Sequence, residues 1–126
     1  MTIPDGMPQP PSAHEVATAI RLARHGHSVI FRRVDNTPGA VNPDAIVDGE
    51  VWEFKSPRGA SERSTIAEQF KQARRQSHRM VLDLARCGLP DEVSLNQALR
   101  RFHGQRAITE LIVIDHRGRL LKASLG

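Results

Sequence analysis

The sequence predicts a single α/β domain built on a mixed sheet, and the order of its segments carries this prediction. Segments with strand character come three together between residues 28 and 55, and later strands alternate with helical segments. Adjacent strands favour antiparallel pairing, whereas strands separated by a helix favour parallel crossovers. A length of 126 residues and an apolar fraction of 39% suit one domain with its own core.

The N-terminal part begins with an arm and continues into a helix and a strand. Residues 1–11 hold four prolines, so we expect a flexible arm or linker there and the folded domain over residues 12–126. Apolar residues at helical spacing predict a helix that opens at Ser12 and ends at Gly26. The β-branched and aromatic run at 28–34 predicts a strand.

Two short apolar segments, 44–47 and 50–55, flank Asp48-Gly49 and predict a hairpin. Asp-Gly is a strong signal for a two-residue turn, because both turn residues need positive φ angles. In that register Asp44 lies opposite Glu53, and cross-strand partners share one side of the sheet.

The C-terminal half is predicted to alternate helix and strand. We expect a helix over 61–78, a buried strand over 79–84, a helix over 92–104, and strands over 109–115 and 120–124. The segment 79–84 could instead continue the preceding helix. A strand is favoured, because a helix through both segments would be long for so small a domain.

The hairpin carries charges on one side only. Lys55 follows Glu53 by two residues and therefore shares its side with Asp44, whereas Trp52 and Phe54 point the other way, into the core. Opposed carboxylates destabilise a sheet unless something compensates. A divalent cation, most simply Mg²⁺, is one compensation, and the lysine would then act on a water or a phosphoryl group. The structural alternative is a loop cap at Asp44 and a solvated Glu53–Lys55 pair.

"PD" at 43–44 followed by "EFK" at 53–55 resembles the signature of the PD-(D/E)XK nuclease superfamily, whose core runs α-β-β-β-α-β. The resemblance implies a PD-(D/E)XK nuclease-like core, extended here by a further helix and a C-terminal β-hairpin. It implies metal-dependent phosphodiester hydrolysis, with Asp44 and Glu53 as metal ligands and Lys55 as the residue that positions water. Glu15 matches an accessory glutamate, although Ser12-x-x-Glu15 is equally a capping box.

The stretch "GEVWEFKSPRG", the helix ending in "QS" and "MVLDL" are similar to the CdiA-type tRNA-cleaving C-terminal toxin domains of contact-dependent growth inhibition systems. This resemblance implies an RNA endonuclease that favours tRNA, a cognate immunity protein, and action in the bacterial cytoplasm. Delivery as the C-terminal part of a secreted or surface toxin would follow. A DNA endonuclease of the same fold and a non-catalytic basic nucleic-acid-binding module remain alternatives.

Further residues are predicted to contact substrate. Gln76 is the preferred member, by similarity, of a glutamine stripe on the second helix. Hydroxyl and basic groups near the catalytic lysine or on that helix are candidates for phosphate contacts: Ser56, Arg58, Arg63, Lys71 and Arg75. For Arg58 and Arg63 the alternative is a solvated loop charge, and for one of the hydroxyl groups near the start of the helix, Ser56 included, it is N-capping.

Composition narrows the class of protein. The net charge is +4 and fifteen of the eighteen basic residues are arginine, which favours a polyanionic partner, although a GC-rich genome would give the same bias. One cysteine excludes an internal disulfide. No apolar run has the ~20 residues that a membrane span needs, and the histidines form no set with catalytic or zinc spacing.

Overall fold

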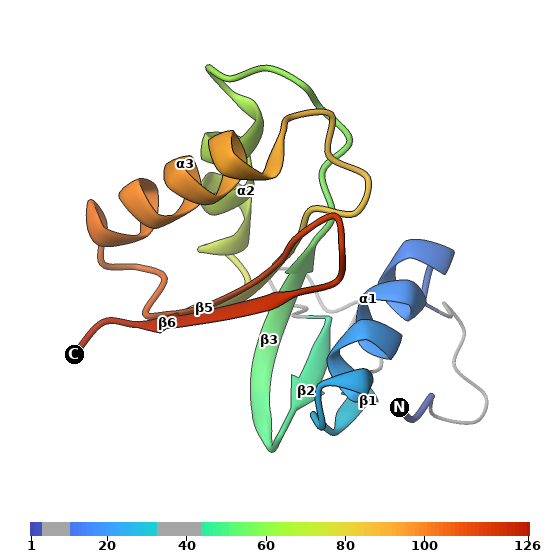
Figure 1. Cartoon of the computed structure of the whole chain (residues 1–126). Coiled ribbons are helices and arrows are strands. Elements are labelled where there is room, and N and C mark those ends of the chain that lie inside the picture. The colour runs from blue at the N-terminus through green and yellow to red at the C-terminus, as the bar shows by residue number, and fades with distance from the viewer. Residues whose placement is uncertain (4–10, 33–43) are drawn as a thin grey trace.

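The structure is a computed structural model that describes residues 1–3, 11–32 and 44–126 (Figure 1). The order of helices and strands predicted from the sequence, α-β-β-β-α-β-α-β-β, is confirmed. The elements are α1 (Ala13–Arg24), β1 (Val29–Phe31), β2 (Ala45–Val47), β3 (Glu50–Lys55), α2 (Thr65–Ala73), β4 (Arg79–Asp83), α3 (Asp91–His103), β5 (Glu110–Ile114) and β6 (Leu120–Ser124).

The six strands form one mixed sheet in the order β1-β2-β3-β4-β5-β6. Strands joined by turns or loops pair antiparallel, whereas β3, β4 and β5 are parallel because α2 and α3 carry the chain back between them. The carboxyl ends of these three parallel strands therefore meet at one edge of the sheet, which we call the carboxyl edge.

The hairpin of β2 and β3 has the predicted register. Val47 pairs with Glu50 and Ala45 pairs with Trp52. Asp48 and Gly49 have φ angles of 51° and 85°, the positive values that this tight two-residue turn requires. The turn thus determines which side chains of the two strands face each other.

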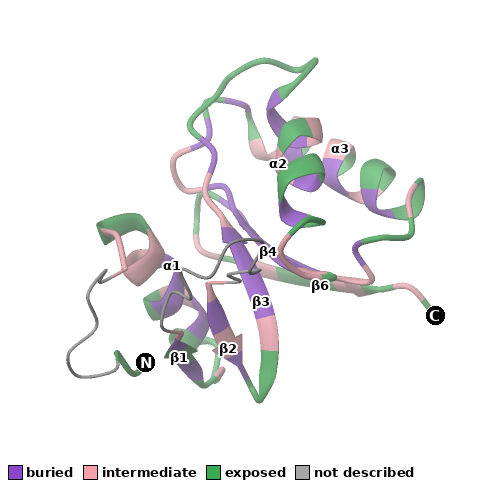
Figure 2. Ribbon diagram, turned by 180° about the vertical axis from the view of Figure 1, so that it is seen from behind, coloured by how far each residue is buried: buried purple, intermediate pink, exposed green. Residues whose placement is uncertain are grey.

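The helices cover both faces of the sheet (Figure 1). α2 and α3 lie together on one face, and α1 lies on the other, against the β1–β2–β3 end. The strands alternate accordingly: Met80 and Leu82 of β4 pack under α2 and α3, whereas Val81 packs toward α1. Buried residues follow the sheet and the inward faces of the helices in Figure 2.

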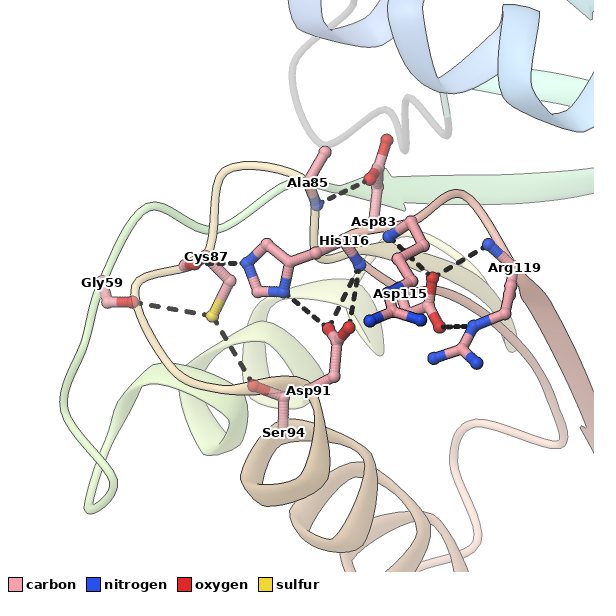
Figure 3. Close-up of polar contacts among 10 residues, drawn as sticks. Gly59, Asp83, Ala85, Cys87, Asp91, Ser94, Asp115, His116 and Arg119 are labelled. Atoms are coloured by element: carbon pink, nitrogen blue, oxygen red, sulfur yellow. Dashed lines mark hydrogen bonds and ion pairs between the residues drawn. The ribbon is translucent and has the colours of Figure 1, made fainter.

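A buried carboxylate attaches α1 to the sheet. Asp83, at the end of β4, is fully buried. Its Oδ2 accepts from Thr18 Oγ1 at 2.6 Å and lies 2.5 Å from a guanidinium nitrogen of Arg21. Its Oδ1 accepts from the backbone N–H of Ala85 at 3.0 Å, as Figure 3 shows.

Two boundaries differ from the sequence prediction. The alternative in which 79–84 continued the helix is wrong, because this segment is the buried central strand β4. The helix expected over 61–78 is shorter and spans Thr65–Ala73. It is followed by a turn and by Ser77, whose hydroxyl donates to Val51 O and accepts from Arg79 N. These bonds fix an extended entry into β4.

Part of the predicted N-terminal region can be described. Thr2 forms a bridge with Ile30, so the first residues pair along the outer edge of β1. The rest of the arm, the end of the strand predicted at 28–34 and the following loop through Pro43 lie outside the described residues. Within the described ranges, no helix has the length and apolar character needed to cross a bilayer.

Candidate active site

The two predicted metal ligands face each other where β2 meets β3. Asp44 immediately precedes β2, and continuation of the observed register places it opposite Glu53. The Asp44 carboxylate accepts a 2.8 Å hydrogen bond from the backbone N–H of Phe54, which holds it against β3. Trp52 and Phe54 lie in the core on the α1 side, as predicted, so Glu53 and Lys55 point toward the α2 side.

Both carboxyl groups are strained electrostatically. Burial, followed by the charge of Glu53, raises the pKa of Asp44 to about 8. Burial also raises the pKa of Glu53, while a hydrogen bond with Asp44 and the charge of Lys55 oppose that rise. Two carboxylates this close do not both ionise at neutral pH without a positive partner. The Lys55 ammonium offsets part of this repulsion, and a shared proton or a bound cation would offset the rest.

One carboxylate oxygen of Glu53 has no partner in the described part of the chain. Its side chain is buried, and its Oε1 makes no hydrogen bond with the described residues. An unpaired buried oxygen is expensive, so such an atom indicates an expected ligand. Among the described residues no group of three or more His, Cys, Asp or Glu side chains converges on one point. Two carboxylates with open positions suit Mg²⁺, which keeps water and takes substrate phosphate oxygens.

Lys55 is the third member of the candidate site. Its Nζ lies 3.5 Å from Glu53 Oε2 and donates to Gln72 Oε1 at 3.3 Å. Gln72 is held in turn by a bond from its Nε2 to Glu68 Oε1 at 3.2 Å. The predicted convergence of two acids and one amine is therefore present in the structure.

Glu15 closes the capping box predicted at the start of α1. Ser12 caps the helix, and Glu15 Oε1 accepts from the Ser12 backbone N–H at 3.1 Å and from its hydroxyl at 2.7 Å. The charge of Glu15 also contributes, as the smallest cause, to the raised pKa of Asp44. The amino end of α1 thus lies near Asp44, and the catalytic role of Glu15 stays a prediction.

The structure brings Gln72, and not Gln76, into contact with Lys55. Gln76 lies in the turn after α2 and is half-buried. The helical stripe of glutamines already contained Gln72, but only the packing of α2 on β3 selects it. The proposed substrate role of Gln76 stays a prediction.

The predicted phosphate contacts divide into two groups. Ser56 is beside the site: its hydroxyl accepts from Arg86 Nε at 3.1 Å and its carbonyl accepts from the same guanidinium at 2.6 Å. Sequence reasoning missed Arg86, which no local pattern links to Ser56. Arg58 is exposed in the loop that follows.

The remaining basic candidates lie just before, on or just after α2 and are exposed. Arg63 lines a groove of about 350 Å³ between α2 and α3, and Lys71 lines an adjoining groove of about 310 Å³. Arg75 lies in the turn after α2. None of the three is described in a hydrogen bond or ion pair with Asp44, Glu53 or Lys55, and their substrate roles stay predictions.

A solved structure shares the fold. It is described as a CdiA-CT/CdiI toxin and immunity complex from Burkholderia pseudomallei, and a chain of it superposes with a TM-score of 0.71. The sequences are 19% identical, and the match covers 99% of this chain and 100% of the other. No curated protein matches the chain.

The family assignment comes from the sequence itself. The family model of the contact-dependent growth inhibition CdiA C-terminal domain matches residues 41–120, which is more than half of the chain. The matched region begins before Asp44 and includes Glu53 and Lys55. The chain therefore belongs to the CdiA C-terminal domain family of contact-dependent growth inhibition.

Proposed function

We propose that this domain is a metal-dependent endonuclease of the PD-(D/E)XK type that cleaves RNA, preferentially tRNA, as a toxin effector. One observation carries the proposal. Asp44 and Glu53 form a directly opposed carboxyl pair in which the buried Glu53 Oε1 has no partner among the described residues, and Lys55 Nζ lies 3.5 Å from Glu53 Oε2. A hairpin built only for stability would not combine these features.

Asp44 and Glu53 would hold the divalent ion, for which Mg²⁺ is the favoured identity. When bound, the ion supplies charge neutralisation at the phosphoryl group and a more acidic water. The carboxyl pair must lose its shared proton to accept the ion, because a metal ligand has to be ionised. Glu53 Oε1 is buried and bonds to none of the residues that the structure describes, so no hydrogen bond among them has to break for it to become a ligand.

Lys55 would act on the reacting groups. Its Nζ is held between Glu53 and Gln72, so the ammonium is oriented by two acceptors and keeps one donor direction for a water or a phosphoryl oxygen. Fixed positive charge at the position where negative charge develops stabilises a transition state strongly. Glu15, at the amino end of α1, is the candidate to orient a water from the other side.

The preference for RNA rests on the resemblance of the stretch around Lys55 to tRNA-cleaving CdiA-type toxin domains, and the basic, arginine-rich chain suits a polyanionic substrate. The similar structure from Burkholderia pseudomallei is a complex of a toxin with an immunity protein. By analogy, we infer that this chain acts in the cytoplasm of a target bacterium after delivery by a larger protein. A cognate immunity protein would neutralise it.

Cleavage of isolated nucleic acids tests the proposal. Purified protein is incubated separately with tRNA, total RNA and plasmid DNA, in Mg²⁺ or in EDTA. We expect tRNA cleavage in Mg²⁺ that EDTA abolishes and added Mg²⁺ restores. Lys55→Ala should remain folded and lose about 10²- to 10³-fold in rate, because it removes charge from the transition state.

The chain offers a matched control for that variant. Lys122 is exposed on β6, so Lys122→Ala removes the same charge away from the site and should cleave at the rate of the unmodified protein. Cleavage that persists in EDTA would contradict the metal. Cleavage of plasmid DNA alone would move the substrate to DNA, and a Lys55→Ala protein that cuts normally would remove the assigned role of the lysine.

A further inference from the structure

A polar pocket with a volume of about 260 Å³ is lined by none of the candidate catalytic residues Asp44, Glu53 and Lys55. It is enclosed by the end of α1 and by the turn that joins β5 to β6. Every lining residue except a glycine carries a basic side chain: Arg21, Arg24, His25, His116, Arg117 and Gly118. Neither the family resemblance nor the catalytic proposal assigns these residues a role.

Hydrogen bonds hold the two walls of this pocket together. His25, the C-cap of α1, bonds through Nε2 to the carbonyl of Gly118 at 2.8 Å. His116 is anchored from both ring nitrogens, with Nδ1 2.6 Å from Asp91 and Nε2 2.7 Å from the carbonyl of Cys87 (Figure 3). The pocket is therefore formed before any ligand arrives.

The charges around the pocket leave a positive surplus. Three nearby acids are each paired with a basic group, as Arg21–Asp83, His116–Asp91 and Arg119–Asp115. Within the described part of the chain, neither Arg24 nor Arg117 uses its guanidinium in an ion pair or hydrogen bond. The negative end of α1 offsets about half a charge, so roughly one and a half positive charges remain. Complementing the helix end therefore accounts for only part of this charge.

The pocket lies at the same edge of the sheet as the candidate active site. β3, β4 and β5 are parallel, and Lys55, Asp83 and Ile114 end them at the carboxyl edge. Arg21 contacts Asp83, and His116 follows β5 by two residues. Neighbouring strands lie about 4.8 Å apart, so the ends of β3 and β5 are separated by about 10 Å. Ligands of open α/β sheets bind at this edge.

We propose that this pocket binds a backbone phosphate of the RNA substrate, away from the phosphate that is cleaved. Arg24 and Arg117 are its ligands, because their guanidinium groups can donate paired hydrogen bonds to phosphate oxygens. The inference rests on the proposed nuclease function and deepens it. It gives the substrate strand a path along the carboxyl edge, from the carboxyl pair at β3 to the turn after β5.

Binding without turnover tests the pocket. Affinity for a fluorescently labelled tRNA is measured by anisotropy in EDTA at several salt concentrations. We expect the Arg24→Ala/Arg117→Ala protein to bind about tenfold more weakly. Its logarithmic salt slope should fall by about 1 to 2, because two phosphate contacts are lost. Both side chains lack described bonds, so the double variant should keep its fold, which circular dichroism verifies.

A matched double variant separates the pocket from net charge. Arg100 and Arg106 are exposed and lie outside the pocket, so Arg100→Ala/Arg106→Ala removes the same charge. An equal loss of affinity in both proteins would overturn the pocket as a phosphate site. A second outcome would also overturn it. If inorganic phosphate shifts the Gly118 amide resonance but the pocket variant binds tRNA as tightly as the unmodified protein, the pocket holds only a free anion.

Failure of this proposal is distinguishable from failure of the nuclease proposal. If the unmodified protein cleaves tRNA but binds it equally well without Arg24 and Arg117, the pocket falls and the nuclease stands. If no cleavage occurs and tRNA binding still depends on both arginines, the pocket is a nucleic-acid site of a non-catalytic protein.

Discussion

Glu53 and Asp83 are buried carboxylates near the ends of neighbouring parallel strands, but they differ in the partners that surround them. Their exposed fractions are 6% and 0%. Asp83 is satisfied by Thr18, Arg21 and the backbone of Ala85. Glu53 faces a second carboxyl group and keeps an unbonded oxygen beside one lysine.

Asp83 has the contacts of a structural acid, whereas Glu53 has the surroundings of the proposed metal ligand. A buried charge is tolerated when the fold supplies its partners, as at Asp83, where the partners come from α1. At Glu53 the fold supplies a second carboxyl group and one lysine, and among the described residues the Oε1 atom has no hydrogen-bond partner. Removing each acid should therefore affect a different property of the protein.

The largest effect is expected on activity at Glu53. Glu53→Gln removes a proposed ligand and should lower the rate of tRNA cleavage about 10²- to 10³-fold in saturating Mg²⁺. Initial rates on tRNA measure the loss. Glu50→Gln is the matched control, because Glu50 is exposed on the same strand, and it should keep full activity. Equal rates for Glu53→Gln and the unmodified protein would erase the distinction between the two acids.

The next effect is on stability at Asp83. Asp83→Asn leaves Arg21 without its buried counter-charge, and the free energy of unfolding should fall by about 2–4 kcal/mol. Urea unfolding in EDTA measures this loss. Asp48→Asn, in the exposed hairpin turn, should cost less than about 1 kcal/mol. An unchanged free energy of unfolding in Asp83→Asn would mean that the contacts of Asp83 with Thr18 and Arg21 contribute nothing to stability.

Binding of a divalent ion should raise the melting temperature through the Asp44–Glu53 pair and not through Asp83. A divalent ion at ten times its dissociation constant adds about 1.4 kcal/mol to folding, so Mg²⁺ or Mn²⁺ should raise the melting temperature. The Asp44→Asn protein should show no increase in melting temperature with the ion, because one of two ligands is removed. The Asp83→Asn protein should melt at a lower temperature but show the same increase. A rise that persists in Asp44→Asn would place the ion elsewhere.

The smallest expected effect is on the pKa of His116, whose imidazole ring pairs with the Asp91 carboxylate. The carbonyl of Cys87, followed by Asp91, raises the pKa of His116 above 6.5. The protonated ring of His116 stabilises the fold, and this contribution is fully present at pH values below about 6.5, the pKa of histidine in the unfolded chain. That contribution is lost as pH rises through the higher folded pKa. NMR titration of the ring should give a pKa above 6.5, and Asp91→Asn should lower it. A value at or below 6.5 would contradict the paired geometry.

Local sequence patterns accounted for the element order and for the centre of the site. Asp48-Gly49 needs positive φ at both residues, which few turns allow, so the register of Asp44 opposite Glu53 followed from two residues. The capping box of Ser12 and Glu15 is equally local and is confirmed. Helix length was less predictable, because α2 stops at Ala73, short of Ser77, whose hydroxyl bonds Val51 of β3 and Arg79 at the start of β4.

The amino-acid sequence by itself determined which acids and which lysine converge, because a hairpin links neighbours whose side chains alternate with a period of two. Only the tertiary structure decided which other groups join them. Gln72 reaches Lys55, Arg86 reaches Ser56, and Thr18 and Arg21 reach Asp83 across 17 to 65 positions of the chain. Such contacts depend on how helices pack against the sheet, and no short-range pattern encodes that packing. The cationic pocket at the carboxyl edge arises in the same way, from two segments that only the fold brings together.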